Sequence, residues 1–255
     1  MIAKTQEEKQ VLREGGRRHA KMLRELLLMV APGVSTMALE EKAREILAAN
    51  GDTSPFLNYK PSGARRAYPA AICVSINDCV VHGIPNESPS IIQEGDVVTV
   101  DVGVNHGGFI TDGAGTSIAG KGDPKDIELI RATEEALDAA IAVAVVGNTT
   151  GDIGHVIEEI AKKYEYGYPI ELGGHGVGRH VHEEPSYGNY GEPGTGAVLK
   201  EGQVLAVEPM FMRGTGKVKL DTDGYSYRTR DGERAAHSEH TILITKDGPE
   251  ILTKE

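Results

Sequence analysis

Two aspartates, Asp101 and Asp112, stand in the most strongly patterned stretch of the chain, residues 97–117. Two apolar, β-branched runs flank residues 105–108 (Asn-His-Gly-Gly), which predicts a β-hairpin with glycine in the turn. With residues 106–107 or all of 105–108 as the loop, Asp101 lies directly opposite Asp112. Facing residues on one side of an antiparallel pair have Cβ atoms about 5 Å apart, where like charges repel. The pattern therefore predicts a cation between the carboxylates; the alternative is that one aspartate sits at a bulge and points to solvent.

Comparison of the two halves of the chain adds a third acidic position, Glu208. Residues 91–101 resemble residues 198–208, so Asp101 and Glu208 occupy equivalent places. Each segment follows two expected helices and a glycine-rich segment with a histidine, His82 in one half and His175 in the other. Chance similarity between short apolar strands is the alternative. The matched acid and the matched order of elements favour two related α/β halves, whose pseudo-two-fold relation would bring both strand ends to a shared centre.

Two further ligand candidates are His175 and Glu239. The glycine-rich residues around His175 let the backbone pack closely around its imidazole. Glu239 stands on a strand that corresponds to residues 109–119, as the counterpart of Asp112. Together with Asp101, Asp112 and Glu208, these residues give four carboxylates and one imidazole, a set suited to Mn, Co, Fe or Zn rather than to a thiolate-rich structural zinc site. So many acids would over-charge one ion, which favours two ions bridged by carboxylates.

The elements that must position these residues alternate between helices and strands. A capping box at residues 5–8 begins a helix that is weakened at residues 15–16 and stopped by residues 32–33, and a second helix runs from about 35 to 50. Two more helices are expected at about 124–145 and 152–164. Residues 52–68 predict a loop. Besides the hairpin, strands are expected at residues 70–76, 79–82, 168–172, 204–211, 217–220, 225–229 and 237–245.

Length and charge limit the classes of protein that the chain can represent. Its 255 residues suffice for one large domain or two small ones, and the net charge of −11 argues against general binding to nucleic acid or anionic membranes. The sequence has no apolar run of transmembrane length and no signal-peptide pattern in its first residues. Its two cysteines, Cys73 and Cys79, fit neither a disulfide framework nor a C-x-x-C motif. We therefore expect a reduced, cytoplasmic protein.

The five candidate ligands, in their sequence contexts, resemble the metal ligands of methionine aminopeptidases. The contexts are G-G-H-G-V-G around His175, V-E-P around Glu208 and S-E-H-T around Glu239, and the likeness covers nearly the full chain. The resemblance implies the pita-bread fold, a pseudo-symmetric α/β sandwich with an antiparallel sheet flanked by helices. The short span from His175 to Glu208 is similar to that of type I enzymes in their compact bacterial form. The expected organisation is a single catalytic domain, 1–255, with halves at about 1–120 and 121–255.

The same resemblance implies a role for each residue of the site. Asp101 would chelate one divalent ion (Co, Mn, Fe, Zn or Ni), Asp112 and Glu239 would bridge both ions, and His175 with Glu208 would complete the other. A bridging water, its pKa lowered by the metals, would attack the carbonyl carbon of the first peptide bond. Glu208 would pass its proton toward the leaving amine.

Two histidines match family positions beside the metal ligands. His182 would hydrogen-bond the substrate carbonyl and its oxyanion, and His82 would contact the scissile amide nitrogen. His106, His180, His237 and His240 have no such match and are expected to be structural.

The substrate pocket departs from the usual pattern. Tyr68 and Cys73 match pocket-lining positions. Arg65 stands where an aromatic residue is often found, Val181 replaces a usual phenylalanine, and Tyr225 replaces a usual tryptophan. These changes leave the expected metal chemistry intact and predict a looser pocket for the methionine side chain.

The expected function is metal-dependent removal of the N-terminal methionine from newly made proteins whose second residue is small. The expected partners are nascent polypeptide N-termini, with transient ribosome contact left open, no membrane, no sequence-specific nucleic acid and a monomeric state. One alternative is another hydrolase of this fold, such as an Xaa-Pro dipeptidase, which usually carries a large extra N-terminal domain. A second is a non-catalytic binding protein of this fold, which would usually lack some of the metal ligands.

Overall fold

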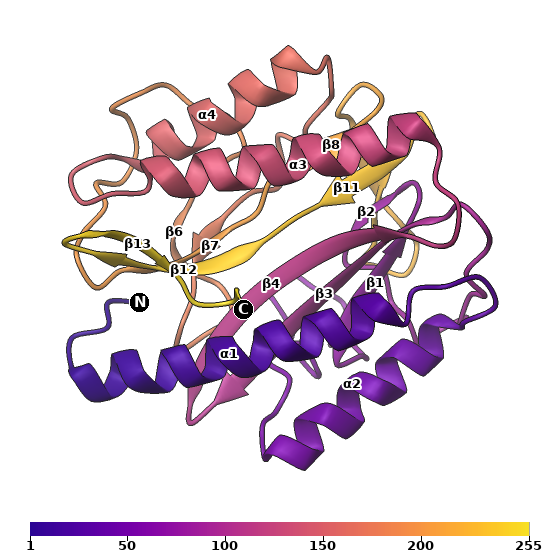
Figure 1. The fold of residues 1–255 in the computed structure, drawn as a ribbon, viewed down its shortest axis with the longest axis horizontal. Coiled ribbons are helices and arrows are strands. Elements are labelled where there is room, and N and C mark those ends of the chain that lie inside the picture. Colours follow the sequence, from indigo (N-terminus) through magenta and orange to yellow (C-terminus); the bar gives the residue numbers. More distant parts are fainter. Residues whose placement is uncertain (255) are drawn as a thin grey trace.

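The computed structural model describes residues 1–254, which fold into layers of helices and strands (Figure 1). Helices α1 (Gln6–Leu28) and α2 (Thr36–Asn50) lie on one side of the strands. Helices α3 (Pro124–Val143) and α4 (Thr150–Lys163) lie on the other side. Each helix pair covers its own hydrophobic core, so the strands between them are buried from both directions. This mixed α/β arrangement confirms the expected fold class.

The helix ends follow the expected local chemistry. Thr5 caps α1 with a complete capping box, and Gly51 ends α2 in the left-handed conformation at φ 69°. The expected weak point at residues 15–16 does not interrupt α1. A Cβ at Gly16 would clash with the Leu252 carbonyl, so the glycine allows the C-terminal segment to pack closely on the helix. No helix within residues 1–254 is both long and apolar enough to cross a membrane.

The strands pair antiparallel throughout the described residues. The sheet orders are β1-β3-β4, β2-β10-β9, β11-β8 and β13-β12-β7-β5-β6. The bounds in chain order are β1 Ile72–Ile76, β2 Cys79–Val81, β3 Val97–His106, β4 Phe109–Ile118, β5 His175–Gly176, β6 Glu183–Ser186, β7 Val204–Val207, β8 Met210–Met212, β9 Val218–Leu220, β10 Tyr227–Thr229, β11 Ala235–His237, β12 His240–Thr245 and β13 Gly248–Ile251.

The β3–β4 hairpin has a different register from the expected one. Asp101 pairs with Ala114 and Gly103 pairs with Asp112, so the prediction that the two aspartates face each other directly is wrong. The two-residue turn uses Gly107 and Gly108 at φ 58° and 83°, because a tight hairpin turn of this kind needs positive φ at both central residues. Residues two apart share a face of a strand, so the aspartates are still diagonal neighbours on one face.

Other expected strands also differ in the structure, and those at residues 204–211 and 237–245 are each divided into two. The segment expected to be a strand at residues 168–172 has no strand assignment, and the strand instead begins at His175 and pairs with β6 and β7. Pro169 removes a backbone donor from the earlier segment.

The strands expected at residues 70–76 and 79–82 are present as β1 and β2 and belong to different sheets. The Asn77 side chain bonds Asp96 and the Val97 amide at 2.8 and 3.0 Å, which ties the turn between them to the start of β3.

Candidate active site

Five buried side chains from separate elements of the chain line one cavity of about 800 Å³. These side chains are called the five-residue cluster below. The members are Asp101 on β3, Asp112 on β4, His175 on β5, Glu208 directly after β7, and Glu239 between β11 and β12. Strands of two different sheets thus bring together all the residues that the sequence patterns indicated as ligands.

The donor atoms of the cluster lie at metal-binding separations. Ligand atoms of Asp112, His175 and Glu239 all lie within 4.8 Å of one another. His175 Nε2 lies 3.3 Å from Glu208 Oε1 and 4.0 Å from Asp112 Oδ2. The charge of Asp101 raises the pKa of Asp112 further, as expected for diagonal neighbours on one strand face.

The electrostatics of the five-residue cluster fit bound divalent cations. Burial raises the pKa of Asp101 to about 7 and holds the pKa values of Asp112, Glu208 and Glu239 well above their usual range, with mutual repulsion as the next cause for these three. Among residues 1–254, no hydrogen-bond partner reaches Oδ1 of Asp101 and Asp112 or Oε1 of Glu239. Buried oxygens without donors are costly unless a cation satisfies them. These residues therefore fit metal ions with oxygen and imidazole ligands.

Neighbouring groups orient two of the candidate ligands. His175 Nδ1 lies 2.9 Å from the carbonyl of Gly176 and donates a proton to it. This contact leaves the lone pair of Nε2 directed toward the carboxylates, the usual arrangement of a metal-binding histidine. Asn189 is fully buried, and its amide donates to the Glu208 carbonyl at 3.1 Å.

The second half of the chain holds the Asp112 backbone in place. The Thr241 hydroxyl accepts from the Asp112 amide at 2.8 Å and donates to the Asp112 carbonyl at 2.7 Å. Glu239 exchanges backbone hydrogen bonds with Ala114 at 2.9 and 3.3 Å. Strands β4 and β12 are thus joined at the two residues that carry matched carboxylates.

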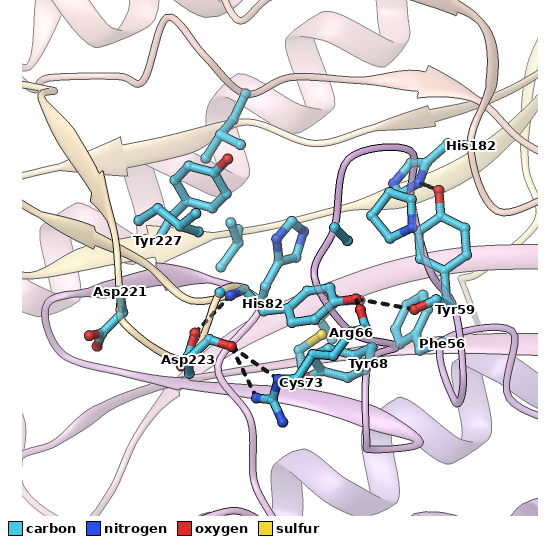
Figure 2. Close-up of a pocket in the computed structure, with 18 of the residues that line it drawn as sticks. Phe56, Tyr59, Arg66, Tyr68, Cys73, His82, His182, Asp221, Asp223 and Tyr227 are labelled. Atoms are coloured by element: carbon cyan, nitrogen blue, oxygen red, sulfur yellow. Dashed lines mark hydrogen bonds between the residues drawn. The ribbon is translucent and has the colours of Figure 1, made fainter.

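The two histidines expected to contact substrate line the same cavity as the five-residue cluster. The His182 ring lies 4.4 Å from the His175 ring, in a T-shaped arrangement. His82 adopts a left-handed conformation at φ 61°, uncommon for a residue with a side chain and frequent at functional sites. Burial lowers the pKa of His82 to about 4, so its imidazole is neutral at pH 7. Both side chains line the cavity, and Figure 2 shows the two rings.

Two cavity residues were missed by the sequence patterns. Tyr59 lies in the aperiodic segment 52–68, where no periodicity marks individual residues, yet its hydroxyl is 2.8 Å from His182 Nδ1 (Figure 2). His237 was expected to be structural. It lines the cavity with Nε2 at 3.5 Å from Glu239 Oε2, and within residues 1–254 neither ring nitrogen has a hydrogen-bond partner. Its place two residues before Glu239 was the available signal.

The remaining unmatched histidines lie outside the cavity lining. His106 Nδ1 contacts Asp52 at 2.8 Å, and His240 Nδ1 contacts the Thr253 hydroxyl at 2.9 Å. His180 is exposed.

An apolar wall lies beside the five-residue cluster. It consists of cavity-lining residues from the hydrophobic cluster of this region, namely Phe56, Tyr59, Ala64, Tyr68, Cys73 and Tyr225. The Tyr68 and Tyr225 rings meet edge to face at 5.1 Å. Val181, also expected in the pocket, is buried in the same hydrophobic cluster but is not among the cavity-lining residues. Arg65, which stands at the expected aromatic position, is an exposed residue of the cavity lining.

Known proteins resemble this chain over nearly its whole length. The profile of metallopeptidase family M24 matches residues 10–246. A methionine aminopeptidase of Aquifex aeolicus is 45% identical over 252 residues, covering 98% of this chain and 97% of the relative. The crystal structure of methionine aminopeptidase from Thermotoga maritima superposes with a TM-score of 0.94 at 41% identity, with complete coverage of both chains. A prolidase from Pyrococcus horikoshii gives a TM-score of 0.76 at 25% identity, but only 63% of that chain is covered. The chain therefore has the pita-bread fold and belongs to metallopeptidase family M24, within the methionine aminopeptidases.

Proposed function

We propose that this site removes the N-terminal methionine from newly made polypeptides whose second residue is small, with two divalent metal ions as cofactors. The observation that carries the proposal is the position of the five-residue cluster. It lies at one side of a cavity that also holds an apolar wall and two histidines. The metal-binding cluster can then receive the free amine of the N-terminal residue, and the apolar wall can receive the side chain of the same residue.

The residues of the cluster have separate roles in holding the ions. Asp101 would hold one ion, Asp112 and Glu239 would hold both, and His175 with Glu208 would hold the other. The oxygen-rich set suits Mn, Co, Fe(II), Zn or Ni. When bound, ions of this kind act as Lewis acids and lower the pKa of a water molecule toward neutrality.

Side chains of the protein transfer the proton and stabilise the charge that develops during the reaction. Glu208 accepts a proton from the attacking water while the water oxygen bonds to the carbonyl carbon of the first peptide bond. As the carbon–nitrogen bond breaks, Glu208 delivers that proton to the leaving amine. His182 donates to the carbonyl oxygen as negative charge develops there, and His82 contacts the scissile nitrogen.

Substrate selection follows from the shape of the cavity. The methionine side chain occupies the apolar wall, where a flexible thioether fills irregular space. A second hollow of about 410 Å³ shares His82, His182 and Glu208 with the first, and it offers room for the chain beyond the scissile bond. A bulky second residue would shift the scissile bond, and a shift of about 1 Å can cost about 10² in rate.

The proposal includes the domain organisation of the protein, its compartment, its partner and its oligomeric state. The chain acts as one catalytic domain, 1–255, in the cytoplasm, and meets nascent polypeptide N-termini as a monomer. Transient contact with the ribosome is compatible with this role. A non-catalytic binding protein would not need four buried carboxylates with raised pKa values around one cavity.

One comparison of peptides tests the proposal against the Xaa-Pro alternative. Met-Ala-Ser and an x-Pro peptide are incubated with metal-stripped protein, and with the same protein after addition of Mn, Co or Fe(II). We expect metal-dependent release of methionine from Met-Ala-Ser alone. Preferential cleavage of the x-Pro peptide, or full activity in rigorously metal-free protein, would overturn the assignment.

A further inference from the structure

We propose that Tyr59 is a positioning residue for His182: its hydroxyl fixes the tautomer and orientation of the imidazole that contacts the substrate carbonyl. This inference rests on the function proposed above. It assigns a role to a residue in a loop without sequence periodicity. The juxtaposition that carries it is the contact of the Tyr59 hydroxyl with His182 Nδ1 at 2.8 Å.

The His182 ring is held from two directions. The Tyr59 ring lies at a centroid distance of 5.3 Å and an interplanar angle of 54°, on the side of the hydroxyl contact. The His175 ring lies at 4.4 Å and 71°. An imidazole on an otherwise exposed residue would rotate about its side-chain bonds, so these contacts restrict it to one orientation.

A Tyr59 hydroxyl that donates to Nδ1 would also set which nitrogen of His182 carries the proton. In a neutral imidazole one nitrogen donates and the other accepts. Tyr59 Oη has no other hydrogen-bond partner among the described residues, so its proton is free to be donated to Nδ1. With Nδ1 as the acceptor, the ring proton lies on Nε2, which points away from Tyr59. Nε2–H is then the donor available to the carbonyl oxygen as it gains negative charge.

Tyr59 is itself fixed by the base of its loop. Its amide donates to the Phe56 carbonyl at 2.9 Å, and its carbonyl accepts from the Tyr68 amide at 2.8 Å. The Tyr225 hydroxyl donates to the Arg66 carbonyl at 2.5 Å and lies 3.3 Å from the Tyr59 carbonyl, where it makes a weaker second contact. A group that positions another must have its own geometry locked, and these bonds meet that condition.

A different role for Tyr59 is as a passive part of the apolar wall. The two roles give different kinetics. Loss of the wall weakens binding of the methionine side chain and raises KM, whereas loss of a hydrogen bond that orients the oxyanion donor lowers kcat. Tyr59→Phe removes the hydroxyl and keeps the ring, so it separates the two roles.

The kinetic test uses the full chain loaded with zinc and the peptide Met-Ala-Ser. We expect Tyr59→Phe to lower kcat by about 3- to 10-fold, the usual range for one neutral hydrogen bond, with KM and metal content unchanged. In a His182→Ala background the same substitution should have no further effect. Tyr164→Phe is the matched control, because among residues 1–254 the hydrogen-bond partner of its hydroxyl is Glu135, at 2.7 Å and away from the cavity. An equal loss in the His182→Ala background, or a change confined to KM, would overturn the proposal.

A spectroscopic measurement of the His182 tautomer tests the role of Tyr59 independently of turnover. In protein with ¹⁵N-labelled histidine and diamagnetic zinc, we expect His182 to carry its proton on Nε2, and Tyr59→Phe to populate both tautomers. A proton on Nδ1 in the unsubstituted protein would refute the positioning role. Inactivity toward Met-Ala-Ser would instead remove the proposed function, while the tautomer measurement would still show whether Tyr59 sets the state of His182.

Discussion

The five-residue cluster and the apolar wall border the same cavity but are built in different ways. The cluster residues stand on strands or within one residue of a strand end, where paired backbones fix their positions. The wall comes mainly from the segment before β1 and the turn before β10, with Cys73 as its strand residue. We infer that paired strands hold the residues that carry out the reaction in a rigid geometry. Selection of the substrate side chain depends instead on loops, which can change in sequence more easily.

The largest effect is expected from a change in the cluster. Asp112→Asn removes the charge of a proposed bridging ligand without changing its size. Activity should fall by at least about 10³-fold and bound metal should fall with it, because Lewis-acid stabilisation is worth several kcal/mol. Metal content by elemental analysis and hydrolysis of Met-Ala-Ser measure both effects. Asp247→Asn, at an exposed turn, is the matched control. Retained metal and activity in Asp112→Asn would contradict the ligand assignment.

Substitution of His182, which lines the cavity but is not a proposed metal ligand, should separate metal binding from catalysis. His182→Ala should lower kcat by about 10²–10³-fold, the typical cost of one oxyanion donor, while metal content stays the same. Steady-state kinetics and metal analysis on one sample provide the measurement. If the loss lay in metal binding instead, His182 would be a ligand or a support for a ligand.

Substrate changes test the wall without altering the protein. Leu-Ala-Ser should be cleaved about 10- to 200-fold more slowly than Met-Ala-Ser, since one methylene-sized mismatch in an apolar pocket has this cost. Acetyl-Met-Ala-Ser should not react, because the free amine must reach the cluster, and Met-Lys-Ser should be poor because of its second residue. Equal rates for the leucine or acetylated peptide would remove the methionine assignment and leave the metal site untouched.

The smallest expected effect concerns stability without metal. The pKa of Asp101 is raised from 3.8 to about 7 by burial, so between these values the native state binds more protons than the unfolded state. The free energy of unfolding must then fall as pH rises from about 4 to 7. Asn at position 101 cannot ionise, so Asp101→Asn lacks the cost of burying a charged carboxylate. Without metal, its free energy of unfolding should exceed that of the wild type by about 1–2 kcal/mol at pH 7, but not at pH 4.

Denaturant unfolding at both pH values, in chelator, measures this difference. Excess divalent metal is the control, since it should reverse the order of the two proteins at pH 7 by stabilising only the wild type strongly. A pH-independent difference would show that the Asp101 carboxyl does not control the stability of the metal-free site.

Much of the fold and of the five-residue cluster could be predicted because the signals were local. The capping box at Thr5 and the glycine stop at Gly51 fix helix ends through chemistry within one turn. The acids could be found because Asp101 and Glu208 follow similar apolar runs of sequence. The hairpin register could not be settled, because residues 105–108 allow more than one loop and only the backbone conformation selects Gly107 and Gly108.

The partners of His182 and of the cluster depend on tertiary contacts. Tyr59 reaches His182 across 123 positions of the sequence, and Thr241 reaches Asp112 across 129. No periodicity or spacing encodes a pairing of that kind, so the supporting groups around a site are harder to predict than its main residues. His237 is a related case, because a lone histidine in an apolar strand is equally typical of a packed core.

The closed base of the loop between Tyr59 and Tyr68 has a consequence for how the chain can be redesigned. Hydrogen bonds join the two ends, from Tyr68 N to Tyr59 O and from Asn58 N to Tyr68 O, at 2.8 and 2.9 Å. The eight or so residues between them are held at both ends, and loop-closure entropy grows only slowly with length. Insertions or deletions at the exposed Ser62 or Gly63 should therefore leave both tyrosine rings in place. The residues between Tyr59 and Tyr68, at the rim of the cavity, can therefore be replaced by a loop of different charge or length. The positions of the two tyrosines should stay the same.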